Sequence, residues 1–258
     1  MTGAIREFDA VLEGAAGLDE AALAREWVYR DRAMDVRYAL YRTLEDAQEA
    51  HVRVVAGPLP ESRRILALAQ RAFGDLRGLL VGLPADLLDR APGNGEWPLR
   101  ETLRHIFIIE RRYALQTLYA IERGDADPVR IPDDRLPTLA QIDVSGGICD
   151  ILVRLAEARS ETSRRLGDVA PAAMTRPTQW GRYDVDVRFR LHRFAAHVIE
   201  HTVQCEKTLA ALGWRPTEGR RIVRRLAALV GEIEGLGGVA AARDIEQRLA
   251  VRVASPAP

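Results

Sequence analysis

Apolar residues recur at intervals of three and four along most of the chain, which is the spacing of one face of an α-helix. This periodicity predicts helices over residues 36–55, 61–81, 98–123, 148–166, 187–212, 217–235 and 239–253. Almost no segment alternates between apolar and polar positions with a period of two, as a half-buried strand would. We therefore expect an all-α protein.

Glycine and proline mark the boundaries of these helices, because they break the helical pattern and favour turns. The turn signals that end successive helices lie at residues 57–60, Gly124, Gly167 and Gly213. Segments 125–147 and 171–186 are rich in turn-forming residues and are expected to be long loops. The second of these loops has room for a short hairpin around Gly181.

The long helices between residues 59 and 214 are sufficient for one antiparallel four-helix bundle. Residues 1–58 are then an N-terminal helical extension, and residues 215–258 are a C-terminal helical extension. No internal repeat is apparent in the sequence. An apolar stripe in the C-terminal extension must be buried, either on the bundle or in a homodimer. The stripe consists of Ile222, Leu226, Leu229 and Ile233.

Composition excludes several classes of protein. Of 258 residues, 47% are hydrophobic, which is enough for a sizeable core, while Lys+Arg and Asp+Glu are both 37. This balance argues against a nucleic-acid-binding protein, which would have a basic excess. We find neither a secretory signal nor an apolar run long enough to span a membrane, so we expect a cytoplasmic protein without a membrane partner. The two cysteines do not form a disulfide framework.

The segment His197–His201 (HVIEH) is the strongest candidate for chemistry. Its two histidines are four residues apart, so on a helix both side chains point the same way and can bind one divalent metal ion. The chain has five histidines, and His105 lies toward the packed side of another predicted helix. A buried imidazole needs a metal, a carboxylate or a carbonyl as partner. Three imidazoles and a water would make an open, catalytic type of metal site.

Three residues close to these histidines are candidates for a supporting role. Gln204 can hydrogen-bond to a ligand or to a histidine ring, or it can make an ordinary interhelical bond. Cys205 continues the same stripe and either lines a pocket or serves as a small core residue. Glu101 precedes His105 by one helical turn and is a candidate to support the site or line its pocket.

Two further residues have two open interpretations each. Glu200 either supports the site or forms a surface ion pair with Arg193 or Lys207. It is also the general base if HVIEH is the H-x-x-E-H motif of a metallopeptidase, which we disfavour because the chain lacks that mixed fold. His192 either reaches the pocket mouth beside Arg188 and Arg190, or these arginines pair with the acidic loop that precedes them.

Two segments together resemble the DinB/YfiT-like superfamily. GEWPLRETLRHI, with Trp97, Glu101 and His105, is similar to its first histidine motif, and HVIEHTVQCEKTLAALGW is similar to its second. The resemblance extends over residues 61–214. It implies a four-helix bundle that binds a divalent metal, most often zinc or nickel, through His105, His197 and His201. Characterised relatives include enzymes that use mycothiol, bacillithiol or glutathione, such as maleylpyruvate isomerases and S-transferases.

The expected function is therefore a metal-dependent enzyme for a small molecule. The reaction is either a thiol transfer or isomerisation with a low-molecular-weight thiol, or a hydrolysis. The nucleophile is a metal-bound thiol or a metal-bound water, and the sequence does not choose between them. The alternative is a metal-containing helical module that binds or assembles without catalysis. Polar groups in a cavity beside the metal would favour the enzyme, and a site sealed by Leu and Ile would favour the module.

Overall fold

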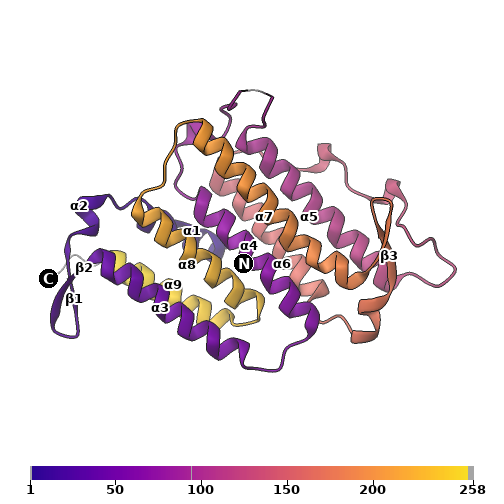
Figure 1. Ribbon diagram of the computed structural model, residues 1–258, viewed down its shortest axis with the longest axis horizontal. Coiled ribbons are helices and arrows are strands. Elements are labelled where there is room, and N and C mark those ends of the chain that lie inside the picture. Colours follow the sequence, from indigo (N-terminus) through magenta and orange to yellow (C-terminus); the bar gives the residue numbers. More distant parts are fainter. Residues whose placement is uncertain (1, 94, 255–258) are drawn as a thin grey trace.

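The computed structural model describes residues 2–93 and 95–254, and it is helical over most of its length (Figure 1). The predicted all-α class is confirmed. Four long helices form the bundle: α4 (Glu61–Leu80), α5 (Leu99–Glu122), α6 (Ile148–Leu166) and α7 (Val187–Ala211). None of the helices in the described part of the chain is long and apolar enough to cross a membrane.

Two short β-hairpins precede helices α3 and α7. The expected hairpin around Gly181 consists of β3 (Pro177–Trp180) and β4 (Tyr183–Asp186). The other, β1 (Glu26–Tyr29) with β2 (Arg32–Asp35), was not predicted. Its turn contains no glycine. Arg30 and Asp31 occupy the turn positions instead and adopt positive φ angles of 49° and 61°. A turn of this kind usually has Asn-Gly or Asp-Gly, so the usual sequence signal is missing.

The apolar core of the bundle contains a buried ion pair between α5 and α6. Arg159 on α6 donates from Nη1 to both carboxylate oxygens of Glu110 on α5, at 2.8 and 2.9 Å. The Thr162 hydroxyl donates to the same carboxylate at 2.6 Å. Both charged side chains are almost fully buried, at 0% and 2% exposure. The pair therefore links α5 to α6 inside the bundle, where loss of one partner would leave an uncompensated charge.

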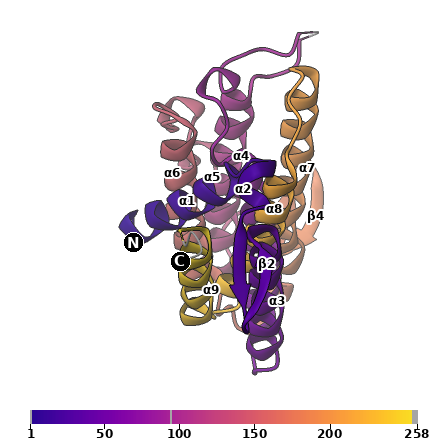
Figure 2. The same ribbon diagram turned by 90° about the vertical axis from the view of Figure 1, so that its left-hand side faces the viewer.

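Four further helices lie outside the bundle and share a second apolar core. They are α1 (Thr2–Ala16), α3 (Val36–Val55), α8 (Glu218–Gly235) and α9 (Val239–Ala254). Figure 2 views the molecule from their side, and the short helix α2 (Glu20–Leu23) lies close to them. The apolar stripe of α8 is buried within the chain, since Ile222, Leu226 and Ile233 are at most 3% exposed.

Helices α4 and α8 approach each other backbone to backbone through glycines. Gly74 and Gly78 on α4 face α8, and Gly231 and Gly235 on α8 face α4. A Cβ atom on Gly78 would lie 2.6 Å from a Cα atom of α8, and one on Gly235 would lie 2.7 Å from a Cα atom of α4. Real Cβ atoms do not come so close to backbone, so any larger residue forces the helices apart.

We expect Gly78→Ala to lower the free energy of unfolding by about 1–3 kcal/mol, because overpacking displaces α8 from α4. Gly14→Ala in helix α1 is the matched control, since its new methyl would meet nothing closer than 4.0 Å. That control should be neutral or stabilise by up to about 1 kcal/mol, because alanine favours helix. Urea denaturation measures both variants. Equal effects of the two substitutions would contradict the close contact.

Candidate metal centre

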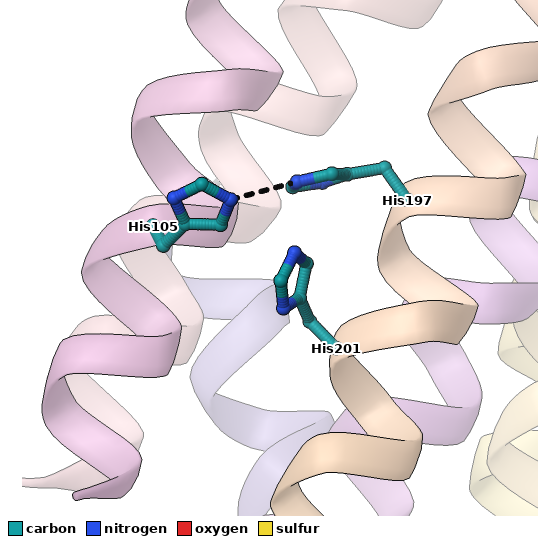
Figure 3. A group of neighbouring side chains, drawn as sticks. All are labelled: His105, His197 and His201. Atoms are coloured by element: carbon teal, nitrogen blue, oxygen red, sulfur yellow. Dashed lines mark hydrogen bonds between the residues drawn. The ribbon is translucent and has the colours of Figure 1, made fainter. Parts of the chain in front are cut away.

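Two neighbouring helices of the bundle bring three histidines together. His105 projects from α5, and His197 and His201 project from successive turns of α7 (Figure 3). Helix α7 begins at Val187 because the Asp186 carboxylate accepts a hydrogen bond from the Phe189 amide at 2.7 Å. The predicted convergence of the three residues is therefore present in the structure.

The three rings meet at one point. His105 Nε2 and His197 Nε2 are 3.2 Å apart, and the centroids of the His197 and His201 rings are 4.4 Å apart. One nitrogen of each ring lies within 4.8 Å of the others. His197 and His201 are buried at 6% and 9% exposure, whereas His105 is partly exposed. The His197 and His201 rings are thus buried, and solvent reaches the group on the side of the His105 ring.

The surroundings of these rings favour the neutral imidazole. Burial is the largest of the effects that lower the pKa of His197 to about 3, and the neighbouring His201, His105 and Arg193 contribute in the same direction. Burial also lowers the pKa of His105, against an opposing effect of the nearby Glu200 carboxylate. At neutral pH both rings therefore offer lone pairs, which is the form that binds metals.

Gln204 orients the third ring. His201 Nδ1 lies 2.8 Å from Gln204 Oε1. Because a carbonyl oxygen only accepts, the proton is assigned to Nδ1, and the lone pair of His201 is then on Nε2. A bond of this kind to the second ring nitrogen is the usual support of a metal-ligating histidine. Gln204 therefore has the contact expected for a supporting residue.

Two aromatic side chains also pack on the histidines. The Trp97 ring lies 5.5 Å from the His105 ring, and the Tyr113 ring lies 5.7 Å from the His197 ring, between centroids. Tyr113 in turn accepts a hydrogen bond from Trp180 Nε1 at 3.2 Å. Sequence reasoning missed Tyr113, although it follows His105 by eight residues and so occupies the same face of α5.

A cleft of about 400 Å³ opens beside His105. Its wall consists of Trp97, Glu101, Arg104, His105, Leu139, Ala140 and Ile142. Glu101 and Arg104 form an ion pair at 2.7 Å on this wall, and both side chains are partly exposed. The loop opposite is tied to α5 because Arg100 donates to the Gly146 carbonyl at 2.9 Å. The cleft is therefore partly polar and adjoins the open side of the histidine group.

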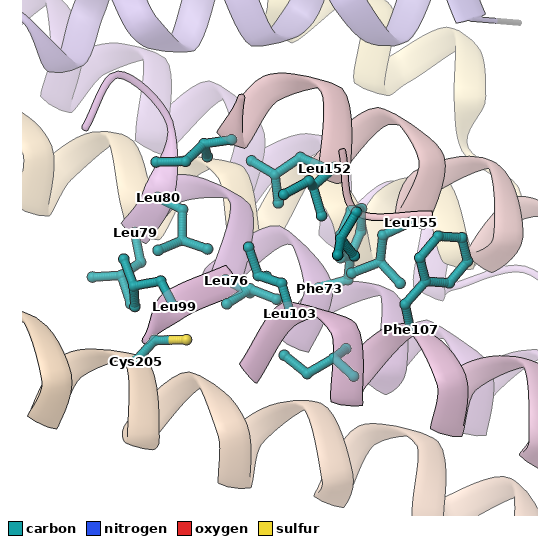
Figure 4. Close-up of a cluster of buried hydrophobic side chains, with 14 of the residues drawn as sticks. Phe73, Leu76, Leu79, Leu80, Leu99, Leu103, Phe107, Leu152, Leu155 and Cys205 are labelled. Atoms are coloured by element: carbon teal, nitrogen blue, oxygen red, sulfur yellow. The ribbon is translucent and has the colours of Figure 1, made fainter. Parts of the chain in front are cut away.

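Cys205 and His192 do not contribute to this cleft. Cys205 is fully buried among apolar side chains such as Leu79 and Leu99 (Figure 4), and burial raises the pKa of its thiol to about 12. Of the two interpretations of Cys205, the structure shows the core residue, because the next turn of α7 faces the core. His192 is exposed and acts electrostatically on Glu61 at the start of α4.

The other charged residues near the second motif also have structural partners. Arg188 pairs with Glu61 at 2.6 Å, and it lies 3.7 Å from Asp186 of the preceding loop. Arg190 is buried and donates to the Gln179 carbonyl at 3.1 Å. Neither arginine faces the cleft. Glu200 is exposed, and its charge acts on His105, whose pKa it raises against the larger effect of burial.

The fold and the histidine group define a class of protein, a helical bundle with a candidate metal centre between two helices. The family model of the DinB superfamily matches residues 68–205, which is more than half of the chain, and the protein belongs to this superfamily. The match contains His105, His197 and His201. No curated protein matches the chain.

The donor set is suited to a metal of intermediate softness. Three neutral imidazole nitrogens favour zinc, nickel, copper or iron over magnesium and calcium, which prefer oxygen ligands. The three rings come from elements fixed by the bundle core, so their positions do not depend on a loop. Among the described residues these three histidines can hold one ion.

We expect the metal-free protein to lose stability as the pH falls from about 6.5 toward 3. The pKa of His197 is about 3 in the folded chain, so in this window the unfolded chain binds a proton that the folded chain does not. The loss should reach a few kcal/mol, on the order of 1.4 kcal/mol per pKa unit. Urea denaturation at several pH values, after chelation, measures it. His197→Leu should flatten the dependence, and a slope equal to that of the wild type would contradict the burial effect.

We also expect Gln204→Leu to weaken metal binding by about 10–100-fold, since it removes the acceptor that fixes the His201 ring. Chelator competition measures the affinity. Glu200→Gln is the control on the same helix, and it should change affinity by less than about threefold because Glu200 is exposed and acts only through its charge. Identical effects of the two variants would show that the hydrogen bond to His201 does not support the site.

Proposed function

We propose that the protein holds one divalent metal ion, zinc or nickel, through His105, His197 and His201 and is a metal-dependent enzyme for a small molecule. The observation that carries this proposal is the position of the histidine group beside an open, partly polar cleft. A site sealed by aliphatic side chains would instead have favoured a module without catalysis.

The cleft has the size and chemistry of a small-molecule site. Its volume of about 400 Å³ lies at the lower end of the range for ligand pockets, roughly 300–1,000 Å³. Trp97 offers an aromatic surface. The Arg104 guanidinium, which is paired with Glu101 in the free protein, can instead bind a carboxylate of the ligand. A small molecule with an acidic group is therefore the substrate or co-substrate that fits.

When bound, the metal would act as a Lewis acid that lowers the pKa of a coordinated thiol or water. The chain supplies the rest. Gln204 holds the His201 ring, and burial keeps His197 neutral and ready to bind. Glu101, on the cleft wall beside His105, is placed to exchange a proton with a ligand in the cleft. These roles fit thiol transfer or isomerisation with a low-molecular-weight thiol, and they also fit a hydrolysis.

The first experiment is elemental analysis of the purified protein, followed by titration of the Ni²⁺- or Co²⁺-loaded form with glutathione and mycothiol. We expect about one ion per chain and a new thiolate-to-metal absorption band when a thiol binds. His105→Ala and His201→Ala should each abolish both signals. A loaded protein that binds neither thiol excludes reactions with these two thiols; bacillithiol is then titrated in the same way, and esterase substrates test hydrolysis.

Arg104→Gln tests the recognition of an acidic ligand. We expect it to weaken thiol binding about tenfold or more, because charged hydrogen bonds contribute about 1.5–3 kcal/mol, while the metal content stays the same. Arg111→Gln on the same helix is the control, since Arg111 lines a different cleft, between α5 and α6. Equal affinities of the two variants for the thiol would contradict the role of Arg104.

A further inference from the structure

The segment that carries the two α7 histidines has a counterpart near the N-terminus. Residues 35–42 (DVRYALYR) and 186–193 (DVRFRLHR) share five identical residues, 151 positions apart. Both segments follow a hairpin of two four-residue strands in the same register, Glu26 with Asp35 and Pro177 with Asp186. In both, the aspartate caps the helix by accepting the amide of its third residue, at 2.7 Å.

Helices α4 and α8 are related in the same way. Residues 61–65 (ESRRI) and 218–222 (EGRRI) differ at one position and are 157 residues apart. The same offset relates the glycine segments 74–79 (GDLRGL) and 231–236 (GEIEGL). The glycines that allow the close approach are therefore equivalent in the two helices.

The contact between α4 and α8 is reciprocal. Gly78 faces Arg224, whereas Gly235, the equivalent of Gly78, faces Ala67, the equivalent of Arg224. Gly231 faces Gln70 in the same way that Gly74 faces Ala227. Such an exchange of equivalent partners is the mark of a two-fold axis between identical surfaces.

One ion pair occurs twice. Arg188 Nε at the start of α7 donates to Glu61 of α4 at 2.6 Å, and Arg37 Nε at the start of α3 donates to Glu218 of α8 at 2.7 Å. Arg37 is equivalent to Arg188 by the offset of 151, and Glu61 is equivalent to Glu218 by the offset of 157. The same atoms thus join the same two helices in both halves of the molecule.

The helix contacts complete the correspondence. If α8 corresponds to α4 and α9 to α5, then α3 corresponds to α7, because α3 packs on α8 and α9, and α7 packs on α4 and α5. In the same way α1 corresponds to α6, because α1 packs on α8 and α9, and α6 packs on α4 and α5. The two hairpins lie at opposite ends of the molecule (Figure 1), as a two-fold axis between α4 and α8 requires. An internal repeat that was not apparent in the sequence is therefore present. The last two helices of its second copy, α1 and α3, come first in the chain, and its first two helices, α8 and α9, come last.

We infer that α8, α9, α1 and α3 form a second copy of the metal-binding bundle, which retains the backbone of a metal site at Asp46, Ala50 and Arg248. By the offset between α3 and α7, Asp46 corresponds to His197 and Ala50 to His201. The buried positions of α5 and α9 match when Arg248 corresponds to His105. The matched pairs are Leu99 with Ala242, Thr102 with Ile245, and Ile106 with Leu249.

We call the second copy (α8, α9, α1 and α3) the outer bundle and the one with the three histidines (α4, α5, α6 and α7) the inner bundle. In the outer bundle an ion pair lies where the inner bundle has its candidate metal site. Asp46 Oδ2 lies 2.8 Å from Arg252 Nη1 and 3.6 Å from Arg248 Nη1, both from α9. The pair joins α3 to α9 where a metal ion between His105 and α7 would join α5 to α7. The two bundles thus pack on each other within one chain as two copies would in a dimer. At the positions equivalent to the three histidines, the outer bundle has Asp46, Ala50 and Arg248.

The test rebuilds the outer site in the full chain. The variant carries Asp46→His, Ala50→His and Arg248→His in a background with His105→Ala and His201→Ala, so the metal it binds cannot come from the inner site. Zinc is titrated by competition with a chromophoric chelator. We expect about one ion per chain, bound at least about tenfold more tightly than by the control, because three converging ligands replace a pair.

The control carries Glu45→His, Glu49→His and Arg248→His in the same background. It has the same number of histidines and the same four-residue spacing, but at exposed positions of α3. A folded rebuilt variant that binds zinc no more tightly than this control overturns the inference. Since the inner site is absent throughout, this result is independent of the proposed function.

Ala50 is buried, so its replacement can prevent folding, which circular dichroism would show. In that case Asp46→His with Arg248→His carries the test, against Glu45→His with Arg248→His. The first pair spans two helices at the proposed site and should bind zinc more tightly than the second. Equal binding by the two pairs overturns the inference as well.

Discussion

The backbone contact between α4 and α8 is the constraint on which the rest of the structure depends. Helix α4 packs on α7 and α6 on one side and on α8 on the other, so it joins the four-helix bundle to the outer helices. The glycines at the contact remove the side chains that would keep the two helices at the usual distance of 8–10 Å. The position of α7, and with it that of two histidines, therefore depends on α4, which is itself held against α8.

The histidine group is the other constrained feature, since it places three imidazoles close together in a partly buried site. In the metal-free chain the only contact between ring nitrogens that the described residues show here is the hydrogen bond of 3.2 Å between His105 Nε2 and His197 Nε2, which requires a proton on one of the two nitrogens. His197 does not become a cation at neutral pH, because its pKa is lowered to about 3, chiefly by burial. A shared metal ion would accept the lone pairs of all three rings at once, and the adjoining cleft would give a ligand access to it.

The helices from α3 to α9 could be predicted to within about two residues because their apolar period is regular and glycine or proline ends them, whereas α1 (Thr2–Ala16) and α2 (Glu20–Leu23) were not predicted. The grouping of His105 with His197 and His201 followed from the spacing on two helices and from the family resemblance. The position of Cys205 could not be predicted in this way, because helical spacing gives a direction and does not show whether a cleft or the core lies there. The hairpin at Glu26–Asp35 was missed because its turn contains Arg30 and Asp31 in place of glycine.

The internal duplication was missed for another reason. The identical residues are confined to short segments, such as 35–42 with 186–193, and the copy is split between the two ends of the chain. The residues that carry the chemistry, His197 and His201, are those that differ, with Asp46 and Ala50 in their places. Only the contacts between helices show that the two halves have one architecture and that one of them holds the histidines.

X-ray absorption at the metal edge tests the central claim most directly. For the wild-type protein loaded with zinc, we predict three imidazole nitrogens at about 2.0–2.1 Å, with the multiple scattering typical of histidine rings. His197→Ala should lower the imidazole number to two or abolish binding. A sulfur shell at about 2.3 Å, or a spectrum with fewer imidazoles in the wild type, would show that the three histidines do not form the metal centre.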